Sequence, residues 1–272
     1  MANPKVKKER LDVLLVEQGF FNSRENAKRH IMEGIILVNN VPVDKAGTKV
    51  PSDAEIRIKG HIMPYVGRGG YKLEKALKFF KIDLNGKVVA DIGASTDCAL
   101  QNGAVKVYAI DVGTNQLDWK LRTDQRVINM EKTNIKLVTL ETLGEPVDFV
   151  CTDISFISVT KIIPAVKSIL KPDGSIAALI KPQFEAGREK VGKGGIVRDP
   201  EVHKEVIRDT LKTFEESGYF CWGLTYSPIK GGSGNIEFLT YLRSSIPQVF
   251  INDEDINAVV EEAHNNLLKG QV

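Results

Sequence analysis

Charged side chains stand near the ends of four apolar segments of this sequence. Asp91 lies near the end of "KVVADIG", Asp111 near that of "VKVYAIDVG" and Asp153 at that of "VDFVCTD", while Lys181 closes "SIAALIK". The segments are continuously apolar and alternate with helical stretches, which is typical of strands in a parallel sheet covered on both faces. The carboxyl ends of such strands share one edge, where ligands bind. We therefore expect the four charged groups to meet there, although a single acid after a strand is more often a helix cap.

The acids of the first two strands indicate which ligand this edge could bind. Asp111 follows Asp91 by 20 residues, the spacing at which a carboxylate receives the two hydroxyls of a ribose in doubly wound folds. Both S-adenosylmethionine and NAD carry such a ribose. The first turn reads "DIGAST" and lacks the G-x-G-x-x-G run that holds a pyrophosphate. The sequence therefore favours S-adenosylmethionine and disfavours a nicotinamide oxidoreductase.

Two further charged residues can reach the same edge. Lys72 lies in the first turn of the predicted helix "GYKLEKALKFF", where a cation opposes the helix dipole and gains nothing locally. Glu237 begins the last apolar run, "EFLTYL", and reaches the edge if that strand runs antiparallel to the others. Simpler alternatives stay open: Lys72 exposed to solvent, and Lys181 laid along apolar surface with its ammonium in water.

The charge of the chain is unevenly divided. The 272 residues have a net charge of +2, but residues 1–72 carry 13 Lys and Arg against 8 Asp and Glu, whereas residues 73–272 carry 24 against 27. A basic head on a mildly acidic body suggests a polyanionic partner for the head. A solvated charged surface is an equally simple explanation of the excess.

The head has a pattern of its own. Apolar residues at helical spacing around Leu11 and Ile31 predict two short helices, and "IILVNNVPV" predicts a hairpin that turns at Asn39-Asn40. This run resembles the S4 RNA-binding domain, whose motif residues are matched at Arg10, Ser23, Arg24, Gly34, Val38, Asn39 and Lys45. The resemblance implies that the domain binds phosphates of structured RNA by shape and backbone contacts. The expected RNA-binding residues are Arg10, Arg24, Lys28, Arg29 and Lys45.

The rest of the chain resembles the FtsJ-like ribose 2′-O-methyltransferases and, with the S4-like head, the hemolysin A (TlyA) family, which methylates ribosomal RNA. The family's Lys-Asp-Lys-Glu tetrad matches "GRGGYKL", "CTDISF", "IKPQFE" and "GNIEFL" at Lys72, Asp153, Lys181 and Glu237. The resemblance implies S-adenosylmethionine as cofactor, with contacts at Asp91, Gly93, Asp111 and Glu131, and cytidines of 16S or 23S RNA in ribosomal subunits as substrate.

Ribose methylation assigns a role to each member of the tetrad. A free lysine, with a pKa of about 10.4, is a poor base near pH 7, but burial beside a second cation can lower it toward roughly 7–8. We expect Lys181 to take the proton of the 2′-hydroxyl and Lys72 to stabilise the developing alkoxide. Asp153 and Glu237 would orient the two ammonium groups.

One part of the chain departs from the family pattern. The first turn of the family reads Gly-Ala-Ser-Thr-Gly-Gly-Phe-Thr-Asp-Cys, whereas this chain has "GASTDC". Only 13 residues separate Asp91 from Val105, which is barely enough for a parallel crossover. Either a segment has been omitted from the sequence or the pocket for the methionine is altered; we favour omission because the tetrad is intact.

These patterns predict a small α+β S4-like domain followed by a doubly wound, Rossmann-like α/β domain with a mainly parallel sheet. The expected boundaries are residues 1–60 for the S4-like domain, 61–70 for a linker, 71–245 for the methyltransferase domain and 246–272 for an acidic, helical C-terminal segment. The catalytic groups would then all lie in the second domain.

Several classes of protein are disfavoured. The N-terminal apolar stretch is interrupted by Asp12, and no window has the roughly 18–20 apolar residues of a membrane span. Cys98, Cys151 and Cys221 are far apart and lack metal-ligand spacing, so we expect a reduced, cytoplasmic protein without a metal site or an obligate protein partner. The main rival function is an RNA-binding ribosome assembly factor with an inactive methyltransferase body. A membrane-lysing hemolysin is less favoured.

Overall fold

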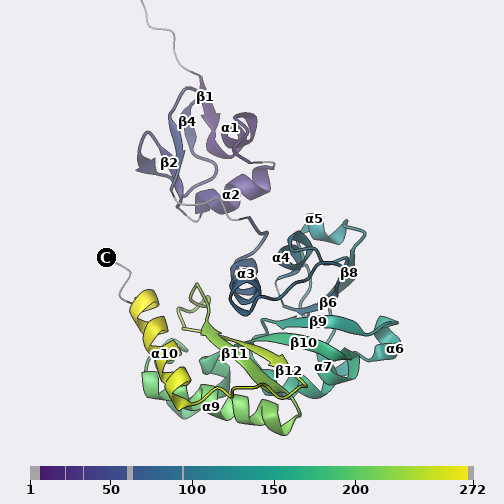
Figure 1. Ribbon diagram of the computed structural model, residues 1–272. Helices are drawn as coiled ribbons and strands as arrows, with labels where there is room; N and C mark the ends of the chain where they lie inside the picture. The colour runs from purple at the N-terminus through teal and green to yellow at the C-terminus, as the bar shows by residue number, and fades with distance from the viewer. Residues whose placement is uncertain (1–6, 22, 33, 60–63, 94, 269–272) are drawn as a thin grey trace, which may run out of the picture. The chain divides into compact units, whose positions relative to one another are not determined.

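The computed structural model describes residues 7–21, 23–32, 34–59, 64–93 and 95–268. The chain divides into two compact units, residues 1–64 and residues 65–272, and each is described by itself (Figure 1).

The first unit packs two helices on short antiparallel strands. It contains β1 (Lys8–Arg10), α1 (Leu11–Glu17), α2 (Arg24–Met32), β2 (Ile36–Val38), β3 (Val41–Pro42), β4 (Lys49–Pro51) and β5 (Ile56–Ile58). Strand β2 pairs with β3 and β5, and β1 pairs with β4. Asn39 and Asn40 have φ of 49° and 64°, as a tight hairpin turn requires. The two helices and the hairpin predicted from the sequence are confirmed.

The buried carboxylate of Asp12 connects the start of this unit to helix α2. The Asp12 side chain is fully buried and accepts hydrogen bonds from Arg10 Nε at 2.9 Å and Arg24 Nη2 at 2.9 Å. The Arg10 guanidinium, helped by Arg24, lowers the pKa of Asp12 to about 2. Two of the three arginines predicted to bind RNA, Arg10 and Arg24, are therefore held in place by one acid, which cancels half of their combined charge.

The second unit is built on a seven-stranded sheet in the order β11-β12-β10-β9-β6-β7-β8. Its strands are β6 (Val88–Ile92), β7 (Lys106–Ile110), β8 (Val127–Met130), β9 (Val147–Thr152), β10 (Leu170–Ile180), β11 (Phe220–Tyr226) and β12 (Phe238–Arg243). Strand β12 is antiparallel to both of its neighbours, and the pairs from β10 to β8 are parallel. The expected doubly wound, mainly parallel sheet is confirmed.

Helices cover both faces of this sheet (Figure 1). They are α3 (Gly69–Phe80), α4 (Thr96–Gln101), α5 (Trp119–Arg122), α6 (Leu140–Leu143), α7 (Ile163–Ile169), α8 (Pro182–Glu185), α9 (Pro200–Glu216) and α10 (Asp253–Leu268), with short 3-10 turns at η1 (Ile135–Leu137), η2 (Val159–Ile162) and η3 (Arg188–Lys190). Helix α10 occupies most of the acidic C-terminal segment and packs on α9 and β11.

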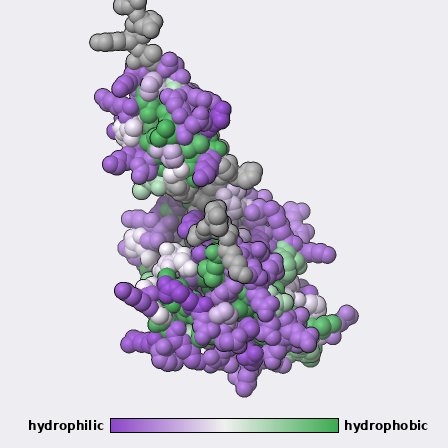
Figure 2. Space-filling model, turned by 90° about the vertical axis from the view of Figure 1, so that its left-hand side faces the viewer, coloured by the Kyte–Doolittle hydropathy of each residue, from purple (hydrophilic) through white to green (hydrophobic). Residues whose placement is uncertain are grey.

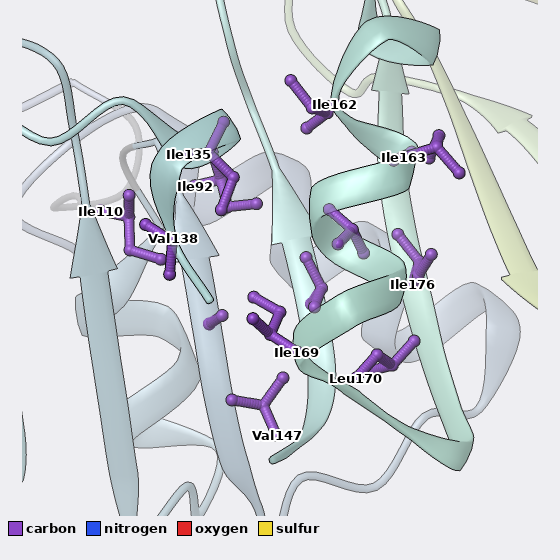
Figure 3. Close-up of a cluster of buried hydrophobic side chains, with 14 of the residues drawn as sticks. Ile92, Ile110, Ile135, Val138, Val147, Ile162, Ile163, Ile169, Leu170 and Ile176 are labelled. Atoms are coloured by element: carbon purple, nitrogen blue, oxygen red, sulfur yellow. The ribbon is translucent and has the colours of Figure 1, made fainter. Parts of the chain in front are cut away.

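Alternation along the strands produces two apolar layers. Val89 and Phe149 point into the layer under α3 and α4, whereas their chain neighbours Ala90 and Val150 point into the layer under α7. Figure 3 shows isoleucines and valines of α7 and the strands interlocking in the second layer. Each such buried side chain contributes about 1.5–3 kcal/mol. The strands read as continuously apolar because both of their faces are buried.

The outer surface contrasts with these layers. On the face seen in Figure 2, residues 65–272 present mostly hydrophilic side chains, with hydrophobic ones in small separate areas. Among the described residues, none of the helices has both the length and the apolar character needed to cross a membrane.

Two local features differ from the sequence-based expectations. Helix α3 begins at Gly69, inside the predicted linker, because Gly70 lets the Tyr65 ring pack directly on the helix backbone; a Cβ there would lie 2.3 Å from the ring. The shortened connection between β6 and β7 still closes a parallel crossover, with α4 reduced to six residues. Residues 61–63 of the predicted linker lie outside the described residues.

We predict that Asp12→Asn destabilises the first unit by about 1–2 kcal/mol at pH 7, a value reduced for solvent screening of the half-exposed guanidiniums. Because the pKa of Asp12 is depressed to about 2, its contribution is complete above the unfolded value of 3.8 and disappears as the pH falls toward 2. Amide hydrogen exchange across α1 and α2 of the full chain measures the loss. Asp44→Asn, at an exposed position, is the matched control, and equal protection in both variants would contradict the prediction.

Candidate active site

Four charged side chains of the second unit form a continuous chain of ion pairs. The Asp153 carboxylate lies between two ammonium groups, with Oδ2 2.9 Å from Lys72 Nζ and Oδ1 2.6 Å from Lys181 Nζ. Lys72 Nζ also lies 2.8 Å from Glu237 Oε2. Two cations and two anions give this tetrad no net charge. The structure thus brings together all four residues that the sequence predicted for the catalytic site.

The strand order explains how distant parts of the chain meet here. Asp153 follows β9, and its N–H donates to Ile92 O at the end of β6 at 2.9 Å. Lys181 follows β10, and Glu237 precedes β12; the two are neighbours because Ile180 pairs with Phe238 in antiparallel register. The expectation that the last strand runs antiparallel, which brings Glu237 to this edge, is confirmed.

The members of the tetrad are largely buried, so each charge needs its partners. Lys72 is 9% exposed, Lys181 6% and Glu237 2%. Burial acts against the charge of Lys72, but Asp153 and Glu237 outweigh it and raise the pKa of Lys72 above its usual value. Burial likewise acts against ionisation of Asp153, but Lys72 and Lys181 outweigh it and lower the pKa of Asp153. Lys72 therefore stays a cation and Asp153 an anion at neutral pH.

Polar neighbours complete the tetrad. Lys181 Nζ donates to Ser155 Oγ at 3.0 Å, and Gln183 Nε2 donates weakly to Glu237 Oε1 at 3.5 Å. Neither Ser155 nor Gln183 is among the predicted site residues. Their only sequence signal is that each lies two residues after a tetrad member.

Two glycines allow the backbone to approach the acids closely. A Cβ at Gly231 would lie 2.4 Å from Glu237 Oε1, and one at Gly93, whose φ is +146°, would lie 3.0 Å from Asp153 O. Real Cβ atoms do not approach this closely without a shift of their neighbours. The run "KGGSGNIEF" places three glycines just before Glu237, a signal of this close approach that was visible in the sequence.

A cavity of about 360 Å³ adjoins the tetrad beyond the ends of β6 and β7. Its lining includes three of the predicted cofactor residues, Gly93, Asp111 and Glu131. Gly93 lies between the two sites, because it lines the cavity and a Cβ on it would lie 3.0 Å from Asp153 O. The cavity lies where doubly wound sheets bind their ligands, next to the point at which the strand order reverses.

The two predicted cofactor acids of the cavity wall, Asp111 and Glu131, differ in their hydrogen bonds. Glu131 Oε1 accepts from the N–H groups of Gln116 and Leu117 at 2.6 and 3.1 Å, and Oε2 accepts from Arg122 at 2.6 Å. These bonds, led by that from Leu117, lower the pKa of Glu131 to about 2. Asp111 Oδ1 accepts from Gly113 N–H at 2.6 Å. Glu131 thus shapes the loop of the wall, while Asp111 has the fewer bonds within the protein.

Asp91 differs from its predicted role as a cofactor contact. It is fully buried and is not among the described residues that line the cavity. Its carboxylate accepts from Ser95 N–H at 2.9 Å and Thr96 Oγ1 at 2.6 Å, so it holds the start of α4. The reason is strand alternation: Asp91 points to the same face as Val89, which α4 covers. Burial raises the pKa of Asp91.

The predicted RNA-binding residues all lie in the first unit. Arg10 and Arg24 are paired with Asp12 and remain about half exposed, with side chains 46% and 48% accessible. Lys28 and Arg29 lie on α2, partly exposed, and Lys45 is exposed in the loop before β4. Asp12 therefore fixes the positions of Arg10 and Arg24, whereas Lys45 is exposed to solvent. Among the described residues, no cluster of His, Cys, Asp and Glu has the composition of a metal site.

Comparison with known families decides what kind of protein carries this site. The sequence pattern of the FtsJ-like methyltransferases matches residues 65–244, and that of the S4 domain matches residues 9–56. The first match covers more than half of the chain. The chain belongs to the FtsJ-like methyltransferase family.

Relatives resemble this FtsJ-like methyltransferase over nearly its whole length. YqxC of Bacillus subtilis (strain 168) is 51% identical over 270 residues, or 96% of each chain. The 16S/23S rRNA (cytidine-2′-O)-methyltransferase TlyA of Mycobacterium tuberculosis is 37% identical over 243 residues, which cover 88% of this chain and 91% of the relative. A solved structure from Streptococcus thermophilus is 44% identical, covers 98% of this chain and 99% of its own, and superposes with a TM-score of 0.77. The domain pairing is therefore shared with these proteins.

We predict that Gly231→Ala displaces Glu237 from Lys72 in this FtsJ-like methyltransferase, because the new Cβ would overlap the carboxylate. Overpacking of this kind costs about 1–3 kcal/mol, which lowers the thermal midpoint by several degrees. Gly232→Ala is the matched control, since its Cβ would meet open space. Thermal unfolding of both variants checks the prediction, and an unchanged midpoint for Gly231→Ala would show that the tetrad is not tightly packed.

Proposed function

We propose that this protein transfers a methyl group from S-adenosylmethionine to a ribose 2′-hydroxyl of ribosomal RNA. The observation that carries the proposal is the buried, neutral chain of ion pairs through Lys72, Asp153, Lys181 and Glu237 beside a cavity at the carboxyl edge of the sheet. The name of the TlyA relative, which specifies cytidine 2′-O-methylation of 16S and 23S RNA, supports cytidine as the target.

The residues around the cavity fit S-adenosylmethionine. Asp111 offers a carboxylate for ribose hydroxyls, Glu131 holds the loop at Gln116 and Leu117, and Gly93 leaves room beside Asp153. When bound, the cofactor supplies an activated methyl group on a sulfonium. We assign to Asp91 the indirect role of holding α4 at the floor of the cavity.

The tetrad removes a proton from the ribose and stabilises the charge that develops. Lys72 touches two carboxylates and remains protonated, so we assign it to the developing alkoxide. Lys181 touches one carboxylate and one hydroxyl, so of the two amines it is the one that we propose loses a proton to solvent before the reaction and then, as the neutral amine, accepts the 2′-proton. Asp153 orients both amines, and Glu237 holds Lys72. Positioning of this kind can supply up to about 7–11 kcal/mol of the barrier.

The S4 domain supplies the affinity for RNA in this proposal. Its excess of Lys and Arg favours phosphate contacts that depend on shape rather than on base edges. We assign these contacts to Lys28, Arg29 and Lys45, together with Arg10 and Arg24 held by Asp12. Ribosomal subunits are the proposed substrate, which implies that the protein acts in the cytoplasm.

A second function is favoured by one observation. The short turn after β6, "GASTDC", lacks four residues of the family pattern, and this change lies where the methionine part of the cofactor would bind. A protein with an altered pocket could bind ribosomal RNA and act in ribosome assembly without transferring a methyl group. Binding of S-adenosylmethionine separates the two functions.

We predict that Lys181→Ala lowers the rate of methyl transfer to unmodified ribosomal subunits by about 10²–10⁴-fold, the usual contribution of a positioned base. Its affinity for S-adenosylmethionine, measured by calorimetry, should stay nearly unchanged because Lys181 is not among the described residues that line the cavity. Lys136→Ala, at an exposed position on η1, is the matched control and should transfer methyl groups normally.

Two outcomes would contradict this assignment. Equal loss of rate and of cofactor affinity would make Lys181 a binding residue. A wild-type protein that binds ribosomal RNA but shows no calorimetric binding of S-adenosylmethionine would instead support the inactive assembly factor.

A further inference from the structure

The Lys181 ammonium has one neighbour that faces solvent. Its Nζ donates to Ser155 Oγ at 3.0 Å and lies 2.6 Å from Asp153 Oδ1. Ser155 is exposed, whereas Lys72, Lys181 and Glu237 are buried. An RNA ribose that approaches Lys181 from solvent therefore also meets the Ser155 hydroxyl.

The segment that carries Ser155 is fixed against the helix that follows Lys181. The next residue, Phe156, has φ of +67°, a conformation that is costly for a bulky side chain and is retained only where its surroundings impose it. Its ring is 91% exposed and contacts Phe184 of α8 on one side, with centroids 5.5 Å apart. In addition, Val159 N–H donates a hydrogen bond to Glu185 Oε1 of α8 at 2.8 Å. Ser155 and Lys181 are thus held by the same two segments.

This arrangement fixes the direction in which Lys181 can react. An amine nitrogen has three positions besides its carbon, which hold hydrogens or, in the neutral form, two hydrogens and a lone pair. A carboxylate can only accept, so Asp153 takes one N–H. If the Ser155 oxygen takes the second, the lone pair is left at the third position. The Ser155 O–H remains available to donate to a different oxygen.

We propose that Ser155 is a positioning residue that directs the lone pair of Lys181 toward the ribose 2′-hydroxyl and donates its own O–H to an oxygen of the target nucleotide. The inference rests on the proposed function. In the transfer step the 2′-oxygen forms a bond to the methyl carbon as the carbon–sulfur bond breaks, and the sulfur keeps the electron pair. The 2′-proton passes to Lys181 Nζ, while Ser155 keeps its proton throughout.

Hydroxyls elsewhere in the same region do not share this position. Ser158 and Thr160 bond to each other at 2.7 Å, and Ser158 Oγ also accepts from Thr160 N–H at the start of η2. Ser168 donates to Ala165 O within α7 at 2.8 Å. Ser168→Ala therefore removes a hydroxyl without touching the tetrad.

The test compares Ser155→Ala, Ser155→Thr and Ser168→Ala in the full-length protein with unmodified ribosomal subunits. For Ser155→Ala we expect kcat to fall about tenfold, less than the 10²–10⁴-fold contribution of a positioned base, because Ser155 only orients that base, with cofactor affinity unchanged. Ser155→Thr, which keeps the oxygen, should restore most of the rate, and Ser168→Ala should match the wild type.

Two results separate this inference from the proposed function. Wild-type kcat in Ser155→Ala, or a loss that Ser155→Thr does not restore, would overturn the role of Ser155 while leaving the methyltransferase intact. If the wild type transfers no methyl group, the proposed function fails. The 15N resonance of Lys181 Nζ then still tests the contact: a shift in Ser155→Ala but not in Ser168→Ala supports it, and no shift in either overturns it.

Discussion

The shared carboxylate of Asp153 is the interaction on which the site depends. It holds two ammonium groups within 3 Å of its oxygens at a place that water reaches poorly. Two buried cations side by side would be unstable alone, since neither desolvation nor mutual repulsion would be offset. Asp153 and Glu237 together remove that obstacle by making the tetrad neutral. The rest of the second unit can be understood as the framework that brings these four groups together.

Several independent features of the fold serve this requirement. Antiparallel β12 brings Glu237 back to the edge at which β9 and β10 end. Helix α3 presents Lys72 from its first turn, where the acids of the sheet offset the unfavourable helix dipole. Gly93 and Gly231 leave space for the two carboxylates. A change in any one of these features would separate charges that are stable only as a group.

The sequence predicted best the residues whose place in the fold follows from the direction of the chain alone. The parallel sheet, the hairpin at Asn39 and the meeting of Asp153 with Lys181 could be predicted because strand ends and turn residues have fixed places in these folds, whereas the resemblance to the family added Lys72 on a helix. The sequence was less informative where side-chain direction or a distant partner mattered. Asp91 was expected at the cofactor, but strand alternation turns it toward α4.

The remaining contacts join residues that are distant in the chain or carry no local signal. The pairing of Arg24 with Asp12 spans 12 positions, and the contact of Lys181 with Ser155 spans 26. No periodicity marks either pair, and each depends on how elements pack. The start of α3 within the predicted linker has a similar cause, because the fit of Tyr65 onto Gly70 is visible only in three dimensions.

The central claim is that the four charges act as one unit, and a double-mutant comparison of methyl transfer tests it most directly. Lys72→Met and Glu237→Gln are measured singly and together, with ribosomal subunits and saturating S-adenosylmethionine. If the charges form one unit, the double variant should be no slower than the slower single variant, because the unit is already broken. Losses that multiply in the double variant would contradict the account, since they would mean that Lys72 and Glu237 act independently.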